Sequence, residues 1–192
     1  TRAVQLHLGS NPTDPLLPFR TVVDAELLDF DGDGFRDLAV LSQPSSISDL
    51  GARLHVYSLR TGATLWESPR LGVGLTQAVG LHMQPGTGQF LLVAALPDGL
   101  HAFGVQSRQL EWTHPIGVAE TAYVADAPGG PEIVVVDANG GVAYLDAGTR
   151  NLRRRHSLSG PALSVTPVPG LPALLYEESS RMTLRYLDGT LI

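Results

Sequence analysis

The sequence predicts an all-β protein, a small β-propeller of about four blades. A strand-like apolar run ends in an aromatic residue four times, at Tyr57, Phe103, Tyr144 and Tyr186, which are 46, 41 and 42 residues apart. Turn-forming residues lie between these runs, and no segment shows a convincing helical pattern. A repeat of about 40–45 residues with about four short strands is typical of propeller blades.

The predicted blades form one domain, 1–192. They span roughly 21–70, 73–115, 117–158 and 160–192. Before them, residues 3–8 alternate apolar and polar side chains, which is typical of a strand. The fourth repeat lacks the last strand of its siblings, so we expect residues 3–8 to supply that strand and close the ring. Two alternatives stay open: half of an eight-bladed ring completed by a second copy, and a fragment of a longer protein.

A second series of apolar strands precedes the aromatic one. Its members are Leu38–Val40, Leu91–Val93, Ile133–Val135 and Ala173–Leu175. Between the two series lie Pro97-Asp98-Gly99 in the second repeat and Asn139-Gly140 in the third. Asn-Gly is the strongest two-residue hairpin signal, so the turn chemistry agrees with hairpins at these places.

Composition narrows the class of protein. The net charge is −6, all 13 basic residues are arginine, and cysteine is absent. A nucleic-acid surface needs a basic face and is not indicated, and neither disulfides nor thiolate metal sites can form. No apolar run approaches the 18 or so residues that a membrane-spanning helix needs. The one basic cluster, 153–156, is predicted to belong to a solvated outer strand, with a phosphate or anion site as the alternative.

The expected location follows from two weaker signals. The chain begins with Thr1 instead of methionine, which hints at a processed or trimmed N-terminus. The lack of cysteine fits a bacterial envelope protein as well as a cytosolic one. We therefore expect a secreted, periplasmic or bacterial cell-envelope protein.

The chain is organised around a loop of alternating acids, residues 29–37. Acidic side chains stand at its positions 1, 3, 5 and 9, and glycines stand at positions 4 and 6. Hard cations such as Ca²⁺ take six to eight oxygen ligands, and alternate carboxylates can deliver several of them from one segment. The predicted Ca²⁺ ligands are Asp29, Asp31, Asp33 and Asp37, together with the backbone carbonyl of Phe35.

This loop resembles a known calcium hairpin. An EF-hand is excluded, because Val40 stands where that loop needs a glutamate and strand-like runs flank the acids. The pattern D-x-D-x-D-G-x-x-D between two strands resembles the calcium hairpin of FG-GAP (VCBS) repeats, the blades of integrin-α-type β-propellers. The resemblance covers about one blade, roughly residues 22–58. It implies a calcium ion that stabilises this blade.

Two later segments resemble the outer hairpin of PQQ-like (quinoprotein-type) propeller repeats. Residues 59–66 and 105–112 each end in tryptophan, as in that family's pattern D-x-x-T-G-x-x-x-W. The resemblance implies either a quinone-dependent dehydrogenase or a non-enzymatic scaffold of bacterial outer-membrane assembly. The cofactor-binding residues of the dehydrogenases find no match in this chain.

The other repeats do not carry the full acidic pattern. Aligned with the four aspartates are His82, Gln84, Gly86 and Phe90 in the second repeat, Val124, Asp126, Pro128 and Glu132 in the third, and Ser164, Thr166, Val168 and Pro172 in the fourth. We therefore expect one calcium site, with Asp126 and Glu132 as at most a remnant of another.

These features together predict a calcium-stabilised β-propeller that acts as a non-catalytic protein-interaction or envelope scaffold module. Its protein partner is unidentified. The alternative is a metal- or quinone-dependent redox enzyme that uses propeller-face histidines such as His55 and His101. No H-E-x-x-H or G-x-S-x-G pattern occurs, so no zincin or hydrolase motif is present.

A partner is expected on one particular face of the propeller. The FG-GAP arrangement implies that the acidic loop and the turn 60–63 share one face. The insertion 42–51 would then lie on the opposite face, near the inter-blade connections 67–78 and 114–120. We expect the partner on this opposite face, because loops on a rigid scaffold carry recognition.

Overall fold

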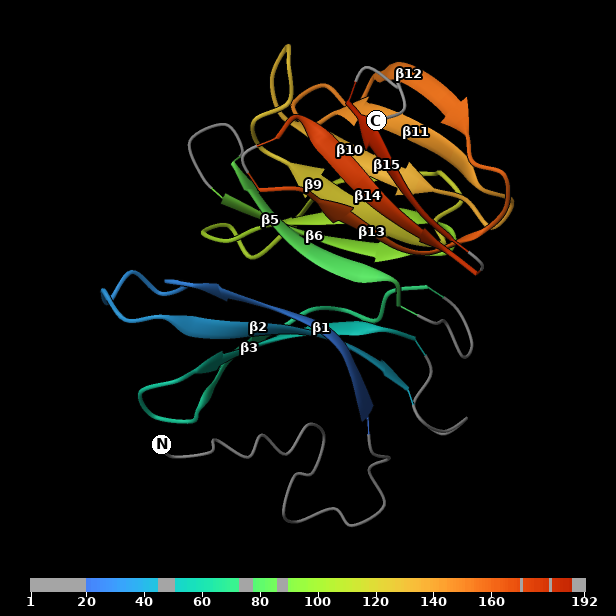
Figure 1. Ribbon diagram of the computed structural model, residues 1–192. Helices are drawn as coiled ribbons and strands as arrows, with labels where there is room; N and C mark the ends of the chain where they lie inside the picture. The colour runs from blue at the N-terminus through green and yellow to red at the C-terminus, as the bar shows by residue number, and fades with distance from the viewer. Residues whose placement is uncertain are drawn as a thin grey trace. The chain divides into compact units, whose positions relative to one another are not determined.

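The fold is all-β, with four antiparallel sheets that form the blades of a small four-bladed β-propeller. The computed structural model describes residues 20–44, 51–72, 78–85, 90–169, 171–179 and 181–187. No helix occurs in these residues, so they contain no helical segment that could cross a membrane. The chain divides into two compact units, Thr1–Ala78 and Val79–Ile192 (Figure 1).

The first unit contains one four-stranded sheet with the order β1-β2-β3-β4. Its strands are β1 (Arg20–Leu28), β2 (Asp37–Pro44), β3 (Arg53–Ser58) and β4 (Thr64–Glu67). Each strand pairs with its neighbour in sequence, so the sheet is an antiparallel meander. The turn between β1 and β2 is the acidic loop.

The second unit contains three sheets of the same kind. The first comprises β5 (Gly80–Pro85), β6 (Phe90–Leu96), β7 (Gly99–Gly104) and β8 (Leu110–His114). The next comprises β9 (Glu120–Val124), β10 (Glu132–Val136), β11 (Gly141–Asp146) and β12 (Leu152–Ser157). The last comprises β13 (Ala162–Pro167), β14 (Ala173–Glu178) and β15 (Arg181–Tyr186).

The predicted hairpin at Asn139-Gly140 is confirmed, because β10 and β11 pair as an antiparallel hairpin across it. Gly140 has a φ of +81°, in the left-handed region that favours glycine. A side chain at this position would also collide with the carbonyl oxygen of Gly160. The hairpin therefore needs glycine for both backbone and packing reasons.

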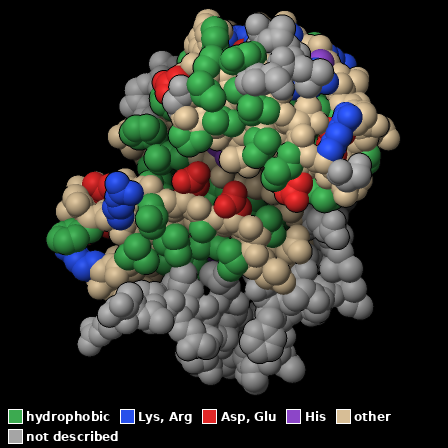
Figure 2. Space-filling model, in the orientation of Figure 1, with side chains coloured by type: hydrophobic (Ala, Val, Ile, Leu, Met, Phe, Trp, Pro, Cys, Tyr) green, Lys and Arg blue, Asp and Glu red, His purple; other side chains and the backbone are tan. Residues whose placement is uncertain are grey.

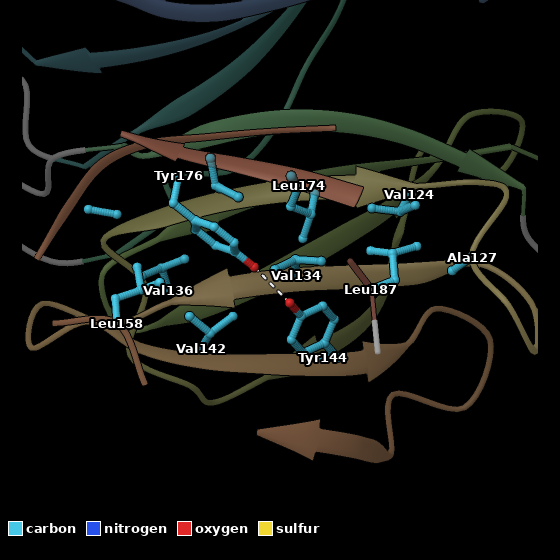
Figure 3. Packing of buried hydrophobic residues seen from close by; sticks show 13 residues of the cluster. Val124, Ala127, Val134, Val136, Val142, Tyr144, Leu158, Leu174, Tyr176 and Leu187 are labelled. Atoms are coloured by element: carbon cyan, nitrogen blue, oxygen red, sulfur yellow. Dashed lines mark hydrogen bonds between the residues drawn. The ribbon is translucent and has the colours of Figure 1, made fainter. Parts of the chain in front are cut away.

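The sheets of the second unit pack through apolar faces. One buried cluster joins β9–β12 to β13–β15 and includes Val134, Leu174 and Leu187 (Figure 3). At its centre the hydroxyl groups of Tyr144 and Tyr176 lie 2.7 Å apart, so one buried phenol donates a hydrogen bond to the other. A second cluster joins β5–β8 to β9–β12. Burial on both faces explains why strand β10 is apolar along most of its length.

The fourth blade differs from the others in its third strand. Strands β3, β7 and β11 are mostly buried, whereas only Thr183 of β15 is buried. A fourth strand covers each of the first three, and no described residue pairs with the outer side of β15. The predicted closing strand, 3–8, lies outside the described residues, as does the central part of the predicted partner insertion, 45–50.

Candidate metal centre

The acidic loop is held at both ends by the β1–β2 ladder. Leu28 and Asp37 are paired residues at the end of that ladder, so the chain must reverse within the loop between them. Phe30 is 5% exposed and stacks on Trp66 of β4, with 5.9 Å between the ring centroids. This aromatic anchor ties the loop to the outer strand of its own sheet.

Backbone amides of the loop donate to its own carboxylates. Asp29 accepts hydrogen bonds from the N–H groups of Gly32 at 2.9 Å and Gly34 at 3.1 Å. Asp31 accepts one from the N–H of Asp33 at 3.2 Å. Gly32 and Gly34 have φ values of +78° and +82°, which is why glycine suits both positions. The loop is thus a tight turn whose carboxylates are oriented by its own backbone.

Three of the predicted ligands converge. One carboxylate oxygen from each of Asp29, Asp31 and Asp37 lies within 4.8 Å of the others. Asp37 is 1% exposed, whereas Asp29 and Asp31 are exposed. Oxygen donors grouped in this way fit a hard divalent cation such as Ca²⁺, with one side of the site buried and the other open to solvent.

Asp33 lies outside this group, and the Phe35 carbonyl stays a prediction. Asp33 pairs with Arg60 of the β3–β4 turn at 3.2 Å and accepts a hydrogen bond from the N–H of Phe35 at 2.9 Å. The guanidinium of Arg60 stands 5.0 Å above the Phe35 ring. These contacts bring the loop and the 60–63 turn together, as the sequence predicted. The pairing of Asp33 with Arg60 was not predicted, because no local pattern indicates it.

The charge on Asp37 is poorly compensated. Burial raises the pKa of its carboxyl, and the negative charges of Asp31 and Asp33 raise it further. A hydrogen bond from the N–H of Phe30, at 2.9 Å, opposes this rise. A bound cation would remove the repulsion and favour the charged carboxylate.

The third blade places an acid at the same position and neutralises it with arginine. Glu132, at the start of β10, is fully buried and accepts hydrogen bonds from both terminal nitrogens of Arg154, at 2.7 and 2.6 Å. Arg153 adds a contact at 3.3 Å. Arg154 pairs across the ladder with Tyr144, whereas Thr64 stands opposite the equivalent Tyr57. Strand β4 therefore offers Asp37 no arginine.

The predicted outer strand at 153–156 is confirmed as β12, at the edge of its sheet and without a buried residue, but of the four basic side chains only Arg155 is exposed. Arg153 and Arg154 reach back to buried Glu132, and Arg153 also pairs with Asp146. His156 packs between the rings of Tyr144 and Tyr176, with centroid distances of 5.5 and 5.8 Å. The one signal of this pairing in the sequence was that Glu132 aligns with Asp37, because a buried acid at that position needs a neighbouring cation.

The two histidines of the redox alternative lie in polar contacts within their own sheets. The His55 ring is buried, lies 3.1 Å from the Ser42 hydroxyl and stacks on Tyr57 at 6.0 Å. His101 lies 3.9 Å from Asp98, in the turn before its strand. Among the residues that the structure describes, the group of three or more side chains suited to a metal is the aspartate cluster.

Comparison with known proteins identifies the fold alone. No family model and no curated protein matches the chain. Similar solved structures include yeast (Saccharomyces cerevisiae) Sqt1, with a TM-score of 0.64 and 9% identity over 88% of this chain. BBS1N in complex with ARL6DN has a TM-score of 0.63 and 14% identity over 98%. The computationally designed Ika8 protein has a TM-score of 0.61 and 13% identity over 90%.

The lengths of these structures differ from that of the present chain. It covers 47%, 55% and 48% of the three structures, respectively. The chain thus spans about half the length of the solved structures that it matches.

Proposed function

We propose that this protein is a calcium-stabilised β-propeller that acts as a non-catalytic protein-interaction or scaffold module outside the cytosol. The observation that carries the proposal is the group formed by Asp29, Asp31 and buried Asp37. The comparison with Glu132 supports it, because the fold supplies two arginines to a buried acid at the same position in the third blade.

The role proposed for calcium is structural. A cation at the three carboxylates would join the two ends of the β1–β2 turn and cancel the repulsion among the acids. Binding only to the folded state stabilises a protein by about 2.7 kcal/mol when the free ion is about a hundredfold above Kd. Largely exposed sites of this kind suit the millimolar calcium of extracellular compartments, which agrees with a secreted or envelope location.

The interaction role rests on the scaffold. Antiparallel sheets with paired strands hold their connecting loops in defined positions, and such loops carry recognition. One of the similar folds, BBS1N, was crystallised in complex with ARL6DN. A propeller that presents loops to a protein partner is therefore the function that the fold supports best.

Elemental mass spectrometry of the purified protein, combined with thermal melting in EDTA and in added Ca²⁺, tests the calcium proposal. We expect about one calcium per chain and a clear rise of Tm with Ca²⁺. Asp37→Asn should abolish both. Asp126→Asn, which removes an exposed acid from the matching turn of the third blade, should leave both unchanged.

Two outcomes would contradict the proposal. Melting that is indifferent to EDTA, with no bound metal, would reject the calcium site. Stoichiometric copper, zinc or iron would favour the redox alternative, and His55→Ala and His101→Ala would then be expected to remove the metal.

A further inference from the structure

A cavity of about 790 Å³ lies at one end of the β9–β12 sheet. It is bordered by the connection that precedes β9, by the β10–β11 turn and by strand β12. Within this sheet, that end is opposite to the β9–β10 turn, which corresponds to the acidic loop of the first sheet. The cavity includes residues 116 and 117 of the connection on which a partner was expected from the sequence.

The cavity combines apolar walls with a polar rim. Half-buried Ile116 provides apolar surface above the buried Val135 and Ala143, and the side chain of Ser157 is exposed. Gly117 is exposed, and a Cβ atom added there would meet no atom within 4 Å. The size lies in the range of ligand-binding pockets and exceeds what a single ion fills.

Arg155 differs from the other two arginines of strand β12 in its contacts. Its neighbours Arg153 and Arg154 are held by Glu132, and Arg153 also by Asp146. The side chain of Arg155 is exposed, lines the cavity and forms no ion pair or hydrogen bond with any described residue. It stands opposite Ala143, which is in turn opposite Val135, so the three share the face of the sheet that borders the cavity.

Asp137, the acidic residue at the rim of the cavity, is already hydrogen-bonded to the backbone. The carboxylate of Asp137 accepts hydrogen bonds from the N–H groups of Asn139 at 2.7 Å and Gly141 at 2.9 Å. Arg155 and the hydroxyl of Ser157 have no such partners in the described part of the chain. The lining side chains that can donate to a ligand are therefore the cation of Arg155 and two neutral donors, the Ser157 hydroxyl and the Asn139 amide, which together suit a carboxylate.

We propose that this cavity docks an acidic segment of a protein partner, with a glutamate or aspartate carboxylate on Arg155 and Ser157 and an aliphatic side chain against Ile116. This inference rests on the proposed interaction function and names the chemistry of the partner. A free phosphate is disfavoured, because Arg155 is the single cation of the lining, while the apolar wall suits a peptide chain.

The test is NMR titration of the isotope-labelled full chain with the peptide acetyl-Leu-Glu-Leu-amide. We expect shifts at the amides of Gly117, Asn139 and Ser157 and at the Arg155 side chain. The Gln and Lys versions of the peptide should bind at least about tenfold more weakly, a factor that corresponds to about 1.4 kcal/mol. Inorganic phosphate, titrated separately, should not displace the glutamate peptide at equal concentration.

Matched variants separate docking from folding. Arg155→Gln should weaken the glutamate peptide about tenfold, and Gly117→Phe should block it by filling the open side of the cavity. Arg150→Gln removes the same charge from the same sheet outside the cavity, and Gly160→Phe adds the same ring at a glycine that does not line the cavity and whose added Cβ would meet no atom within 4 Å. Both controls should bind the peptide as the wild type does.

Three results would overturn the inference: equal binding of the Glu and Gln peptides, full binding by Arg155→Gln, or the absence of shifts at 10 mM peptide. A failure here is distinguishable from a failure of the calcium proposal, because the melting experiment with Asp37→Asn does not involve the cavity. Capture of a protein partner that Gly117→Phe does not affect would keep the interaction function and reject this docking site.

Discussion

Asp37 and Glu132 show how one position in a repeat can be used in two ways. Both start the second strand of a sheet and both are buried. Glu132 receives two arginines from the outer strand, whereas Asp37 lies beside two more carboxylates. A buried acid must be paired or protonated. In the third blade arginine side chains supply the positive charge, whereas the first blade has oxygen donors suited to a cation from solution.

Glu132→Gln tests how much the ion pairs of buried Glu132 with Arg153 and Arg154 contribute to stability. The substitution keeps the size of the side chain but leaves Arg153 and Arg154 without their buried anion. We expect a loss of about 2–4 kcal/mol in the free energy of unfolding, measured by urea denaturation. Glu177→Gln, at an exposed acid of β14, should change it by less than about 0.5 kcal/mol. If Glu132→Gln left the free energy of unfolding unchanged, the ion pairs would contribute no net stability.

His156 predicts a pH dependence. Burial lowers the pKa of its imidazole from 6.5 to about 4, and the charges of Arg185 and Arg154 act in the same direction. The unfolded chain therefore takes up a proton first as the pH falls. Stability from the neutral imidazole is present above pH 6.5 and is lost between about pH 6.5 and 4.

His156→Phe should flatten this part of the pH profile. The ring would still pack against Tyr144 and Tyr176, but no proton would bind at this position. We expect the difference in unfolding free energy between wild type and variant to change by about 2–3 kcal/mol between pH 7 and pH 4. Urea denaturation at several pH values measures it, and parallel profiles of the two proteins would contradict the assignment.

At the scale of the element, the unit of this protein is the antiparallel hairpin. Each strand of a sheet pairs with its neighbours in sequence, so registers depend on short turns. The β10–β11 turn is tightly constrained, since Gly140 combines a positive φ with close packing against Gly160. It also forms part of the rim of the proposed docking cavity.

Gly140→Ala should therefore destabilise the protein by about 1–3 kcal/mol, because an added methyl group strains the backbone and meets the Gly160 carbonyl. Gly160→Ala is the matched control. Its added carbon meets no atom within 4 Å, so we expect a change below about 0.5 kcal/mol. Equal effects of the two substitutions in thermal melting would reject this account of the turn.

At the scale of the whole molecule, the proposed functions belong to different compact units. The aspartate cluster lies in Thr1–Ala78 and the docking cavity in Val79–Ile192. On the face of the second unit that Figure 2 shows, hydrophobic side chains form much of the surface. Calcium is thus expected to stabilise the first unit directly, while recognition depends on the second.

Hydrogen exchange of the full chain tests this division. Removing calcium with EDTA should speed exchange at least about tenfold in β1, β2 and the loop between them, where the ion would join the two strands. The β10–β11 hairpin should change by less than about twofold. An equal acceleration in both units would show instead that calcium controls the stability of the whole chain.

Local features of the sequence determined the fold class, the hairpins and the position of the acidic loop. Strand alternation, turn residues and a repeat of about 40–45 residues act over short distances, so they can be read without a structure. The spacing of Asp29, Asp31 and Asp37 is local in the same way. Whether residues 3–8 close the fourth blade stays a prediction.

Only the tertiary structure decided which charged side chains meet. Asp33 pairs with Arg60 instead of joining the other aspartates, Arg153 and Arg154 reach Glu132, and Arg155 lines a cavity. Each of these outcomes depends on which turns and strands lie beside one another across a sheet, and on the burial that results. The paired residues are 20 or more positions apart, and this spacing follows neither the strand period of two residues nor the blade repeat.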